Sequence, residues 1–357
     1  MALTDKLTAI GDAIRAKTGG TDPIDLTDMP AQIEGISGGF PNGTEWTQSN
    51  MTSAVDVVCY GKGIWVGGKY SGGFWHSTDG MTWTQSNVTS GGPKANILCP
   101  NDDIFVAGSS AGMWYSTDGM TWVQSNVTSG NTYCLEYGNG VFVASLYSGD
   151  TYYSTDGMTW TDCSPSSMQK TLYSIGYAKG VWLAEADGKF HRSIDGMTWT
   201  NLGSIATGSV NGIHYANGVW VFATNNGLWY STDGATLTQS NITQNTFYSA
   251  YFANGIWVTF GSYSTNTGIW YSTDGMTWMQ SNVSNKAYYT SKDSLSYANG
   301  VWVVGTYKKG LFYSTDGMTW TAGNIPDIAV YKAFNANGMW VVPTANGFYY
   351  SPTWLPS

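Results

Sequence analysis

Short apolar runs separated by glycine and small polar residues recur along most of this chain. The clearest pattern is a glycine followed by an apolar run that contains an aromatic residue, as in Gly180–Leu183. Asparagine or lysine precedes the glycine in most copies, and such a dipeptide between two apolar runs predicts a β-hairpin. The eight copies, of which the second is degenerate, are Gly63–Val66, Asp103–Val106, Gly140–Val143, Gly180–Leu183, Gly218–Val221, Gly255–Val258, Gly300–Val303 and Gly338–Val341.

A second motif, the heptapeptide Ser-Thr-Asp-Gly-Met-Thr-Trp, recurs in phase with the first. Successive copies begin roughly forty residues apart, a period at which each repeat must stack on its neighbours to bury its apolar face. Each repeat, with Tyr173–Asp195 and the segment after it as the example, predicts four short strands, which is typical of a β-propeller blade. The copies are Ser77–Trp83, Ser116–Trp122, Ser154–Trp160, Ser272–Trp278 and Ser314–Trp320, with variants at Ser193–Trp199 and Ser231–Leu237.

The two ends of the repeat array predict how the ring closes. The eighth repeat reaches Ser351 but lacks the Asp-Gly turn and the regular strand after it. The segment Asn42–Asn50 closely matches Gly80–Asn87, so it can supply the missing fourth strand and leave no open edge. We therefore expect an all-β fold over residues 42–357, an eight-bladed propeller of four-stranded antiparallel blades closed by the N-terminal strand. A seven-bladed ring with one irregular repeat is the alternative.

The heptapeptide resembles the Asp-box of sialidase-like propellers, Ser-x-Asp-x-Gly-x-x-Trp, although each copy is one residue shorter between aspartate and tryptophan. The resemblance covers residues 40–357 and implies a turn in which aspartate caps backbone amides and tryptophan packs between blades. An Asp-Gly pair favours such a turn on physical grounds as well. One carboxylate per turn is too few for calcium, so we expect no metal. The structural aspartates are Asp79, Asp118, Asp156, Asp195, Asp233, Asp274 and Asp316.

Composition agrees with many short strands and narrows the partners. Charged residues make up only 11% of the chain, whereas aromatic residues reach 15% and glycine numbers 45. A net charge of −9 without a basic cluster argues against nucleic acid or an anionic membrane as partner. No segment is apolar enough to insert in a membrane, and the first thirty residues lack the apolar core of a signal peptide. The four cysteines are expected to be free thiols, which suits folding in a reducing cytosol.

Residues 1–36 follow a different pattern, which predicts two short helical segments. The first contains Leu3 to Ile14, and the second is expected at Leu26–Ile36. The segments Leu7–Gly19 and Thr21–Ile33 resemble a short N-terminal module of bacteriophage virion structural proteins, typically tail-associated or fibre proteins. The resemblance implies a docking or oligomerising segment that contacts other virion proteins, tethered by a glycine-rich linker at residues 37–41. A helical cap that packs on the propeller is the alternative. Helical spacing of apolar residues is clearest at Leu3, Leu7, Ile10 and Ile14.

The sialidase resemblance raises the question of catalysis. That family holds its substrate carboxylate with three arginines, whereas Arg192 is the only arginine of this propeller. A general glycosidase needs two carboxylates roughly 5–10 Å apart, and those expected on first strands, Asp56, Glu136 and Asp293, belong to different blades. The three histidines also fall on separate blades and form no metal-binding spacing. We expect no catalytic residue and no cofactor.

Comparison of the repeats with one another points instead to a binding face. The heptapeptide turns and hairpins hardly vary, whereas the loops on the opposite face vary in length and content. Seven residues before the hairpin glycine, at the expected channel mouth, the blades carry Asp56, Asn96, Tyr133, Tyr173, Asn211, Tyr248, Asp293 and Tyr331. The variable loops add Tyr70, Tyr147, Tyr263 and Tyr307. Tyrosine faces stack on sugar rings while short amides and carboxylates bond hydroxyl groups, so this face suits a glycan. Tyrosines that merely fill the channel are the alternative.

These observations together predict a non-enzymatic phage virion protein of tail or fibre type, made in the host cytoplasm, whose propeller binds a host-surface glycan or protein. Many copies on one particle, or a homo-oligomer, would multiply weak binding. One alternative is a structural or decoration protein, which predicts a large apolar patch on the propeller exterior. Another is a glycan-cleaving depolymerase, which predicts two carboxylates at short separation.

Overall fold

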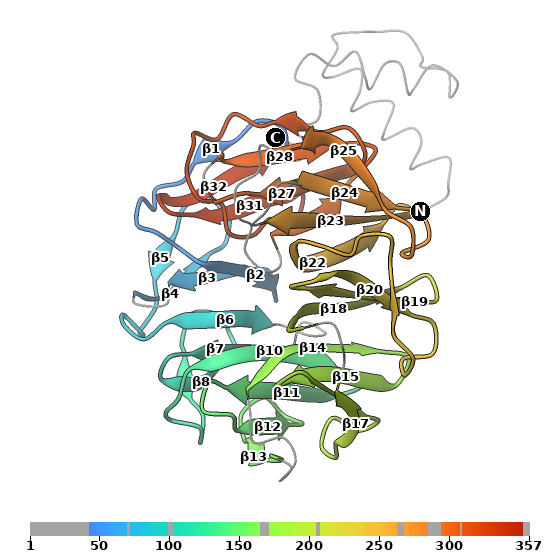
Figure 1. The fold of residues 1–357 in the computed structure, drawn as a ribbon. Helices are drawn as coiled ribbons and strands as arrows, with labels where there is room; N and C mark the ends of the chain where they lie inside the picture. The colour runs from blue at the N-terminus through green and yellow to red at the C-terminus, as the bar shows by residue number, and fades with distance from the viewer. Residues whose placement is uncertain are drawn as a thin grey trace, which may run out of the picture.

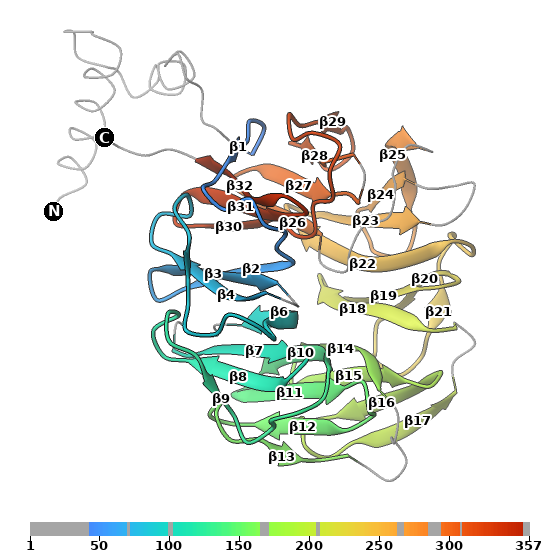
Figure 2. The ribbon, with the colours of Figure 1, turned by 90° about the vertical axis from the view of Figure 1, so that its left-hand side faces the viewer.

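The computed structural model describes residues 43–69, 72–98, 103–164, 171–204, 208–262, 268–284, 294–307 and 309–352. Their strands form eight antiparallel sheets of four strands, which follow one another around a ring (Figures 1 and 2). The predicted eight-bladed propeller is thus confirmed, and the seven-bladed alternative is wrong. The helices expected in residues 1–36 and the linker at residues 37–41 lie outside the described residues. We number the blades 1 to 8 in chain order, from β2–β5 to β30–β32 with β1.

The first strand of each blade is innermost, because it contacts the first strands of both neighbouring blades around the closed ring. The first strands are β2 (Val57–Gly61), β6 (Pro93–Leu98), β10 (Thr132–Gly138), β14 (Leu172–Ala178), β18 (Val210–Ala216), β22 (Thr246–Ala253), β26 (Leu295–Ala298) and β30 (Phe334–Ala336). The second strands are β3 (Ile64–Lys69), β7 (Phe105–Ser109), β11 (Val141–Leu146), β15 (Val181–Ala186), β19 (Val219–Thr224), β23 (Ile256–Ser262), β27 (Val301–Gly305) and β31 (Met339–Thr344).

The outer half of each blade closes the ring. The third strands are β4 (Gly73–Ser77), β8 (Gly112–Ser116), β12 (Thr151–Ser154), β16 (Lys189–Ser193), β20 (Gly227–Ser231), β24 (Gly268–Ser272), β28 (Leu311–Ser314) and β32 (Gly347–Pro352). The fourth strands are β5 (Thr84–Gln85), β9 (Val123–Gln124), β13 (Thr161–Asp162), β17 (Thr200–Ser204), β21 (Thr238–Gln239), β25 (Met279–Ser284), β29 (Thr321–Ala322) and β1 (Thr47–Gln48). β1 pairs with β32, and both views place the blue β1 beside the red β32 (Figures 1 and 2). The predicted closure by the N-terminal strand is therefore confirmed.

The hydrophobic core is divided among the junctions between blades. Eight clusters of buried residues occur in the described part of the chain, each drawn from two neighbouring blades. Trp182 of β15, for example, packs in one cluster with Val143 of β11. The second strands contact neighbours on both faces, and every residue of β11 is buried. This two-sided burial explains why the second strands read as continuous apolar runs.

The hairpins between first and second strands have the geometry that their sequence predicts. In blade 3, Asn139 and Gly140 have φ of 51° and 80°, and Asn217 with Gly218 repeats the pattern in blade 5 at 50° and 86°. Positive φ at both central residues defines the type I′ turn, which matches the twist of the flanking strands. Asparagine and glycine tolerate this conformation best, which explains the recurring dipeptide.

The heptapeptide forms a turn that is closed by its aspartate. Oδ1 of Asp156 accepts hydrogen bonds from the backbone N–H groups of Met158 and Thr159, both at 2.8 Å. Gly157 has φ of 73°, and a Cβ there would lie 2.6 Å from Val106 of the preceding blade. The glycine is therefore required by conformation and by packing. The other six aspartates make the same two backbone bonds.

An asparagine at one position of the repeat ties each of six blades to the next. It lies four residues after the heptapeptide tryptophan, or after Trp46 or Leu237 at the equivalent position. Oδ1 of Asn126 accepts from Trp160 N at 2.8 Å, and its Nδ2 donates to Trp160 O at 2.8 Å. We call this two-bond arrangement the asparagine clamp. The six clamps are Asn50 on Trp83, Asn87 on Trp122, Asn126 on Trp160, Asn241 on Trp278, Asn282 on Trp320 and Asn324 on Trp46.

Blade 4 lacks the clamp on both sides. The positions four residues after Trp160 and Trp199 carry Ser164 and Gly203, which lack the side-chain amide that makes both bonds of the clamp. Ser164 instead bonds within its own blade, where its hydroxyl accepts from Thr151 N at 2.9 Å. The two junctions that flank blade 4 therefore depend on apolar packing and on contacts between first strands.

Candidate functional site

The strands within each blade are antiparallel, so the invariant turns and the variable loops lie on opposite sides of the ring. Hairpins between first and second strands, and heptapeptide turns between third and fourth strands, occur at the same end of the strands. The loops between second and third strands, and the segments leading into the first strands, occur at the other end. We call this second side the loop face. It carries the residues that vary from blade to blade.

Several of the residues predicted at the channel mouth lie where the pairing register between the first and second strands shifts. In β10, Thr132 pairs with Leu146 and Cys134 with Ser145, so Tyr133 between them has no cross-strand partner. Such a β-bulge re-aims a side chain and is common beside binding sites. The corresponding irregularities of other blades contain Tyr173 in β14, Asn211 in β18, Tyr248 in β22 and Asn96 in β6.

Three tyrosines of the loop face come together over blades 3 and 4, and we call them the tyrosine cluster: Tyr133, Tyr147 and Tyr173. The rings of Tyr133 and Tyr173 meet edge to face, with centroids 5.5 Å apart. The rings of Tyr133 and Tyr147 are 6.5 Å apart. The side chain of Tyr147 is 66% exposed, that of Tyr133 is 40% exposed and that of Tyr173 is 38% exposed. The cluster thus presents aromatic faces to solvent.

The backbone beneath Tyr147 is held from two sides. Its N–H donates to the carbonyl of Asn131 at 2.7 Å, and its carbonyl accepts from Thr171 Oγ1 at 2.9 Å. The loop is closed by a bond of 2.8 Å from Leu146 N to Asp150 O. A ring that is exposed on a fixed backbone loses little conformational freedom when a ligand stacks on it, which favours binding.

Tyr133 of the tyrosine cluster is a neutral phenol at ordinary pH. Burial raises the pKa of Tyr133, and the neighbouring Tyr173, Cys134, Tyr147 and Glu185 raise it further. The phenol therefore remains a neutral hydrogen-bond donor.

Glu185 beneath the cluster is fully buried. Burial raises the pKa of its carboxyl group, and this effect is only partly offset by the backbone N–H groups of Gly188 and Val210. Its carboxyl group accepts a hydrogen bond from Gly188 N at 2.6 Å and is not exposed on the loop face.

A second group lies at blades 7, 8 and 1, and we call it the tyrosine–aspartate cluster: Tyr307, Tyr331 and Asp56. Tyr307 is 51% exposed, whereas the other two side chains are half-buried. Burial raises the pKa of Tyr331, and the neighbouring Asp56 and Tyr307 raise it further.

Backbone contacts of their chain neighbours bring the three residues of this cluster together. Thr344 O accepts from Val55 N at 3.0 Å, and Thr344 forms a β-bridge with Val330. Val330 N donates to Thr306 O at 2.9 Å.

The remaining predicted positions do not form one continuous ring of ligand contacts. Asn211 Nδ2 donates to Asn225 Oδ1 at 2.9 Å and to the Phe247 carbonyl at 2.8 Å, so it links blade 5 to blade 6. Tyr248 is half-buried. Tyr70, Tyr263 and Asp293 lie outside the described residues, as does the side chain of Asn96.

Sequence reasoning missed the residues that support the cluster. Asn131 and Thr171, which fix Tyr147, had no signal, because they act through the backbone of another segment. The clamp asparagines did have a sequence signal, because asparagine recurs at the same position of six repeats and is replaced in two. It lies four residues after a tryptophan in five of the six and after Leu237 in the sixth.

Large apolar side chains exposed away from the loop face are spread over several blades. They are Met120 and Val123 in blade 2, Met158 in blade 3, Ile194 and Leu202 in blade 4, Met279 in blade 6 and Met318 in blade 7. Within the described ranges, no three histidine, cysteine or acidic side chains are grouped so as to hold a metal ion. No helix of the same ranges has the length and apolar character to cross a membrane.

Comparison with known proteins finds β-propellers. No protein-family model and no curated protein matches the sequence. The computationally designed Ika8 protein has a TM-score of 0.66 at 14% identity, over 85% of this chain and 98% of its own. BamB from Moraxella catarrhalis has a TM-score of 0.63 at 9% identity, over 86% and 97%. YCF48 bound to D1 peptide has a TM-score of 0.53 at 13% identity, over 86% and 94%. At such identities the similarity shows the fold alone.

Proposed function

We propose that this chain is a non-enzymatic bacteriophage virion protein of tail or fibre type, whose loop face binds a glycan on the host surface. The observation that carries the binding role is the tyrosine cluster, with its exposed rings on a fixed backbone. The virion role is supported by the resemblance of residues 7–33 to an N-terminal module of phage structural proteins. In this proposal the stripe of Leu3, Leu7, Ile10 and Ile14 docks on other virion proteins.

A glycan fits the chemistry of the cluster better than the other ligands considered. Tyrosine faces stack on the apolar faces of sugar rings, and neutral phenols bond their hydroxyl groups. A host-surface protein is the other candidate, supported by YCF48, a propeller solved with a bound peptide. The net charge of −9 disfavours strongly anionic polymers as ligands.

The test is binding of the full-length protein, multimerised on a carrier, to a glycan array and to intact bacteria. Replacing Tyr147 by Ala removes the most exposed ring of the cluster and should weaken binding about tenfold, as expected for an aromatic anchor. Met279→Ala is the matched control, because Met279 is 48% exposed but lies on the outer strand of blade 6. Circular dichroism and thermal unfolding verify that both variants are folded.

Each alternative gives a different result. Binding to bacteria that is abolished by protease treatment of the cells, with a silent array, would make the ligand a protein. No binding to any host, with the chain present in purified particles by mass spectrometry, would support a structural or decoration protein. Release of shorter saccharides from a bound glycan would identify a depolymerase. Absence of the chain from particles would contradict the virion role.

A further inference from the structure

The tyrosine cluster has a counterpart across the loop face. Tyr307 occupies in blade 7 the position of Tyr147 in blade 3, seven residues after the hairpin glycine. Tyr331 likewise occupies in blade 8 the position of Tyr173 in blade 4. Four blades of eight separate the members of each pair, so the two clusters lie on opposite sides of the channel.

Two pairs of equivalent positions distinguish the clusters. Tyr133 of blade 3 corresponds to Asp293 of blade 7, which lies outside the described residues. The other pair differs in one charge. This pair is Asn211 in blade 5, next to the tyrosine cluster, and Asp56 in blade 1, next to Tyr331. The two side chains have nearly the same shape, but an amide can donate hydrogen bonds and a carboxylate can only accept them. Asn211 uses its donors to hold the junction between blades 5 and 6. Asp56 instead adds an anionic group to the second cluster.

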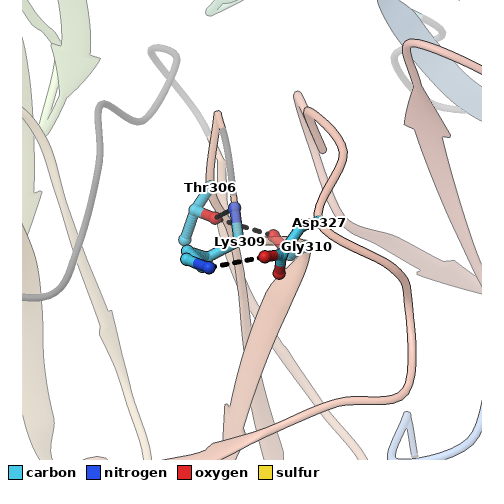
Figure 3. A network of polar contacts seen from close by, with 4 residues as sticks. All are labelled: Thr306, Lys309, Gly310 and Asp327. Atoms are coloured by element: carbon cyan, nitrogen blue, oxygen red, sulfur yellow. Dashed lines mark hydrogen bonds and ion pairs between the residues drawn. The ribbon is translucent and has the colours of Figure 1, made fainter.

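The loop that carries Tyr307 is braced by polar contacts (Figure 3). The carbonyl of Gly310 accepts from Thr306 N at 2.8 Å and from Thr306 Oγ1 at 3.0 Å. The same hydroxyl accepts from Lys309 N at 3.0 Å. The ammonium group of Lys309 forms an ion pair with Asp327, which ties the loop to the segment leading into blade 8. The positive charge of Lys309 and the negative charge of Asp327 compensate each other in this ion pair.

An aromatic ring next to a carboxylate is suited to a cationic group. The face of a tyrosine ring attracts cations, and a carboxylate forms charge-assisted hydrogen bonds with an ammonium group. Glu185 raises the pKa of Tyr133 in the tyrosine cluster, but it is fully buried and accepts from Gly188 N, so its carboxyl group cannot contact a ligand there. The net charge of −9 adds a long-range attraction for cations.

We propose that the tyrosine–aspartate cluster binds a protonated amine of the ligand, as on a 2-amino sugar, while the tyrosine cluster binds a neutral sugar ring. This inference rests on the proposed function, in which the loop face binds a glycan. Asp56 is the specificity-determining residue, and Tyr307 and Tyr331 supply the rings against which the amino sugar packs.

The experiment compares two tetrasaccharides on the full-length protein: chitotetraose, which is N-acetylated and neutral, and its fully de-N-acetylated form, at a pH that protonates its amines. Isothermal titration should show about fivefold tighter binding of the amine form, from one exposed ion pair and one cation–π contact. Asp56→Asn should reduce this ratio to about one, since it removes the carboxylate that pairs with the amine and keeps nearly the same side-chain shape.

Asp187→Asn is the matched control, because it removes the same charge from an exposed turn of the loop face on blade 4. Asp187 has φ of 53°, which asparagine adopts equally well, so the fold is preserved. This variant should keep the full preference for the amine form.

Four results would overturn the proposal. One is failure of the amine form to bind the unaltered protein, whether or not the glycan array finds another ligand. Another is a preference for the amine form that survives Asp56→Asn, which would show that Asp56 does not determine it. A preference that disappears equally in Asp187→Asn would likewise overturn the proposal, because it would be an effect of net charge. The last is Asp56-dependent binding of tetralysine without binding of the amino sugar, which would make the amine that of a protein. The array tests the proposed function separately.

Discussion

At the scale of single residues, side chains that bond to backbone groups account for the most repeated features of this chain. Burial alone would raise the pKa of Asp156, but the backbone N–H groups of Thr159 and Met158 and the Ser154 hydroxyl outweigh it and lower the pKa. The ionised carboxylate is therefore the form that closes the turn. In Tyr147 the main chain rather than the side chain makes the hydrogen bonds, to Asn131 and Thr171, and the ring stays exposed for a ligand.

Removing one turn aspartate tests this role. Asp156→Ala should lower the free energy of unfolding by about 2 kcal/mol, because two backbone N–H groups lose a charged acceptor. Thr155→Ala is the control, since Thr155 is exposed in the same turn, and it should change stability by less than about 0.5 kcal/mol. Guanidinium unfolding of both variants gives the comparison. Equal stability of the two variants would contradict the capping role.

The same turns predict how stability depends on pH. All seven heptapeptide aspartates have a pKa lowered from the ordinary value of 3.8. A pKa that is lower in the folded state gives stability above the unfolded value, and this stability is lost as pH falls through the folded value. The free energy of unfolding should therefore fall steeply below about pH 4.

Glu185 acts in the opposite sense, because burial raises its pKa and its protonation stabilises the fold as pH falls. One such group cannot offset seven aspartates. Denaturant unfolding at a series of pH values measures the outcome, and Asp156→Asn, which cannot titrate, should show a shallower acid decline. Stability that is constant down to about pH 3 would contradict the prediction.

At the scale of strands and blades, the asparagine clamp is the device that holds one blade to the next. Each clamp satisfies the N–H and the carbonyl of one tryptophan, which is Trp46 in blade 8 and the heptapeptide tryptophan in the other clamps, with one side chain. Five of the six asparagines begin an Asn-x-Ser/Thr sequence, and their amide groups are engaged in the clamp. The repetition of this sequence thus reflects the repetition of the clamp.

Loss of one clamp should weaken one junction. Asn126→Ala removes both bonds to Trp160 and should cost about 1–2 kcal/mol of stability. Thr128→Ala, two residues further along the exposed segment, is the control and should be nearly neutral. Differential scanning calorimetry of both variants tests this prediction. A melting temperature of Asn126→Ala equal to that of the control would show that the clamp contributes nothing.

At the scale of the whole molecule, the ring is closed but not uniform. The pairing of β1 with β32 joins the two ends of the array, and clamps secure six of the eight junctions. Blade 4, which carries Tyr173 of the tyrosine cluster, is the one without clamps on either side. The two clusters of the loop face lie four blades apart, so a long ligand that reaches across the channel can contact both.

The missing clamps predict where the ring opens first. In a sample labelled with ¹⁵N-tryptophan, the backbone amide of Trp199 should exchange with solvent at least about tenfold faster than the clamped amides of Trp83, Trp122 and Trp160. All these residues occupy the same position of the heptapeptide, so the clamped tryptophans are internal controls. Equal protection of Trp199 would show that apolar packing alone secures blade 4.

The sequence by itself determined the architecture of this protein. The hairpin requires positive φ at two adjacent residues, and the heptapeptide turn requires an acceptor and a glycine at fixed spacing. Both requirements are met within a few contiguous residues, so they are visible in the sequence. Closure by the N-terminal strand was predictable for the same reason, because Asn42–Asn50 matches the strand that the last repeat lacks.

Only the tertiary structure decided which channel-mouth residues come together. Tyr133, Asn211 and Tyr331 occupy equivalent positions, yet their surroundings differ. Tyr133 joins two tyrosines and Asn211 secures a junction, whereas backbone contacts through Thr344 bring Tyr331 near Asp56. Tyr147 is fixed partly by Thr171, which belongs to the segment leading into the next blade. These outcomes depend on bulges and on contacts between blades, which join residues far apart in the chain and leave no local pattern.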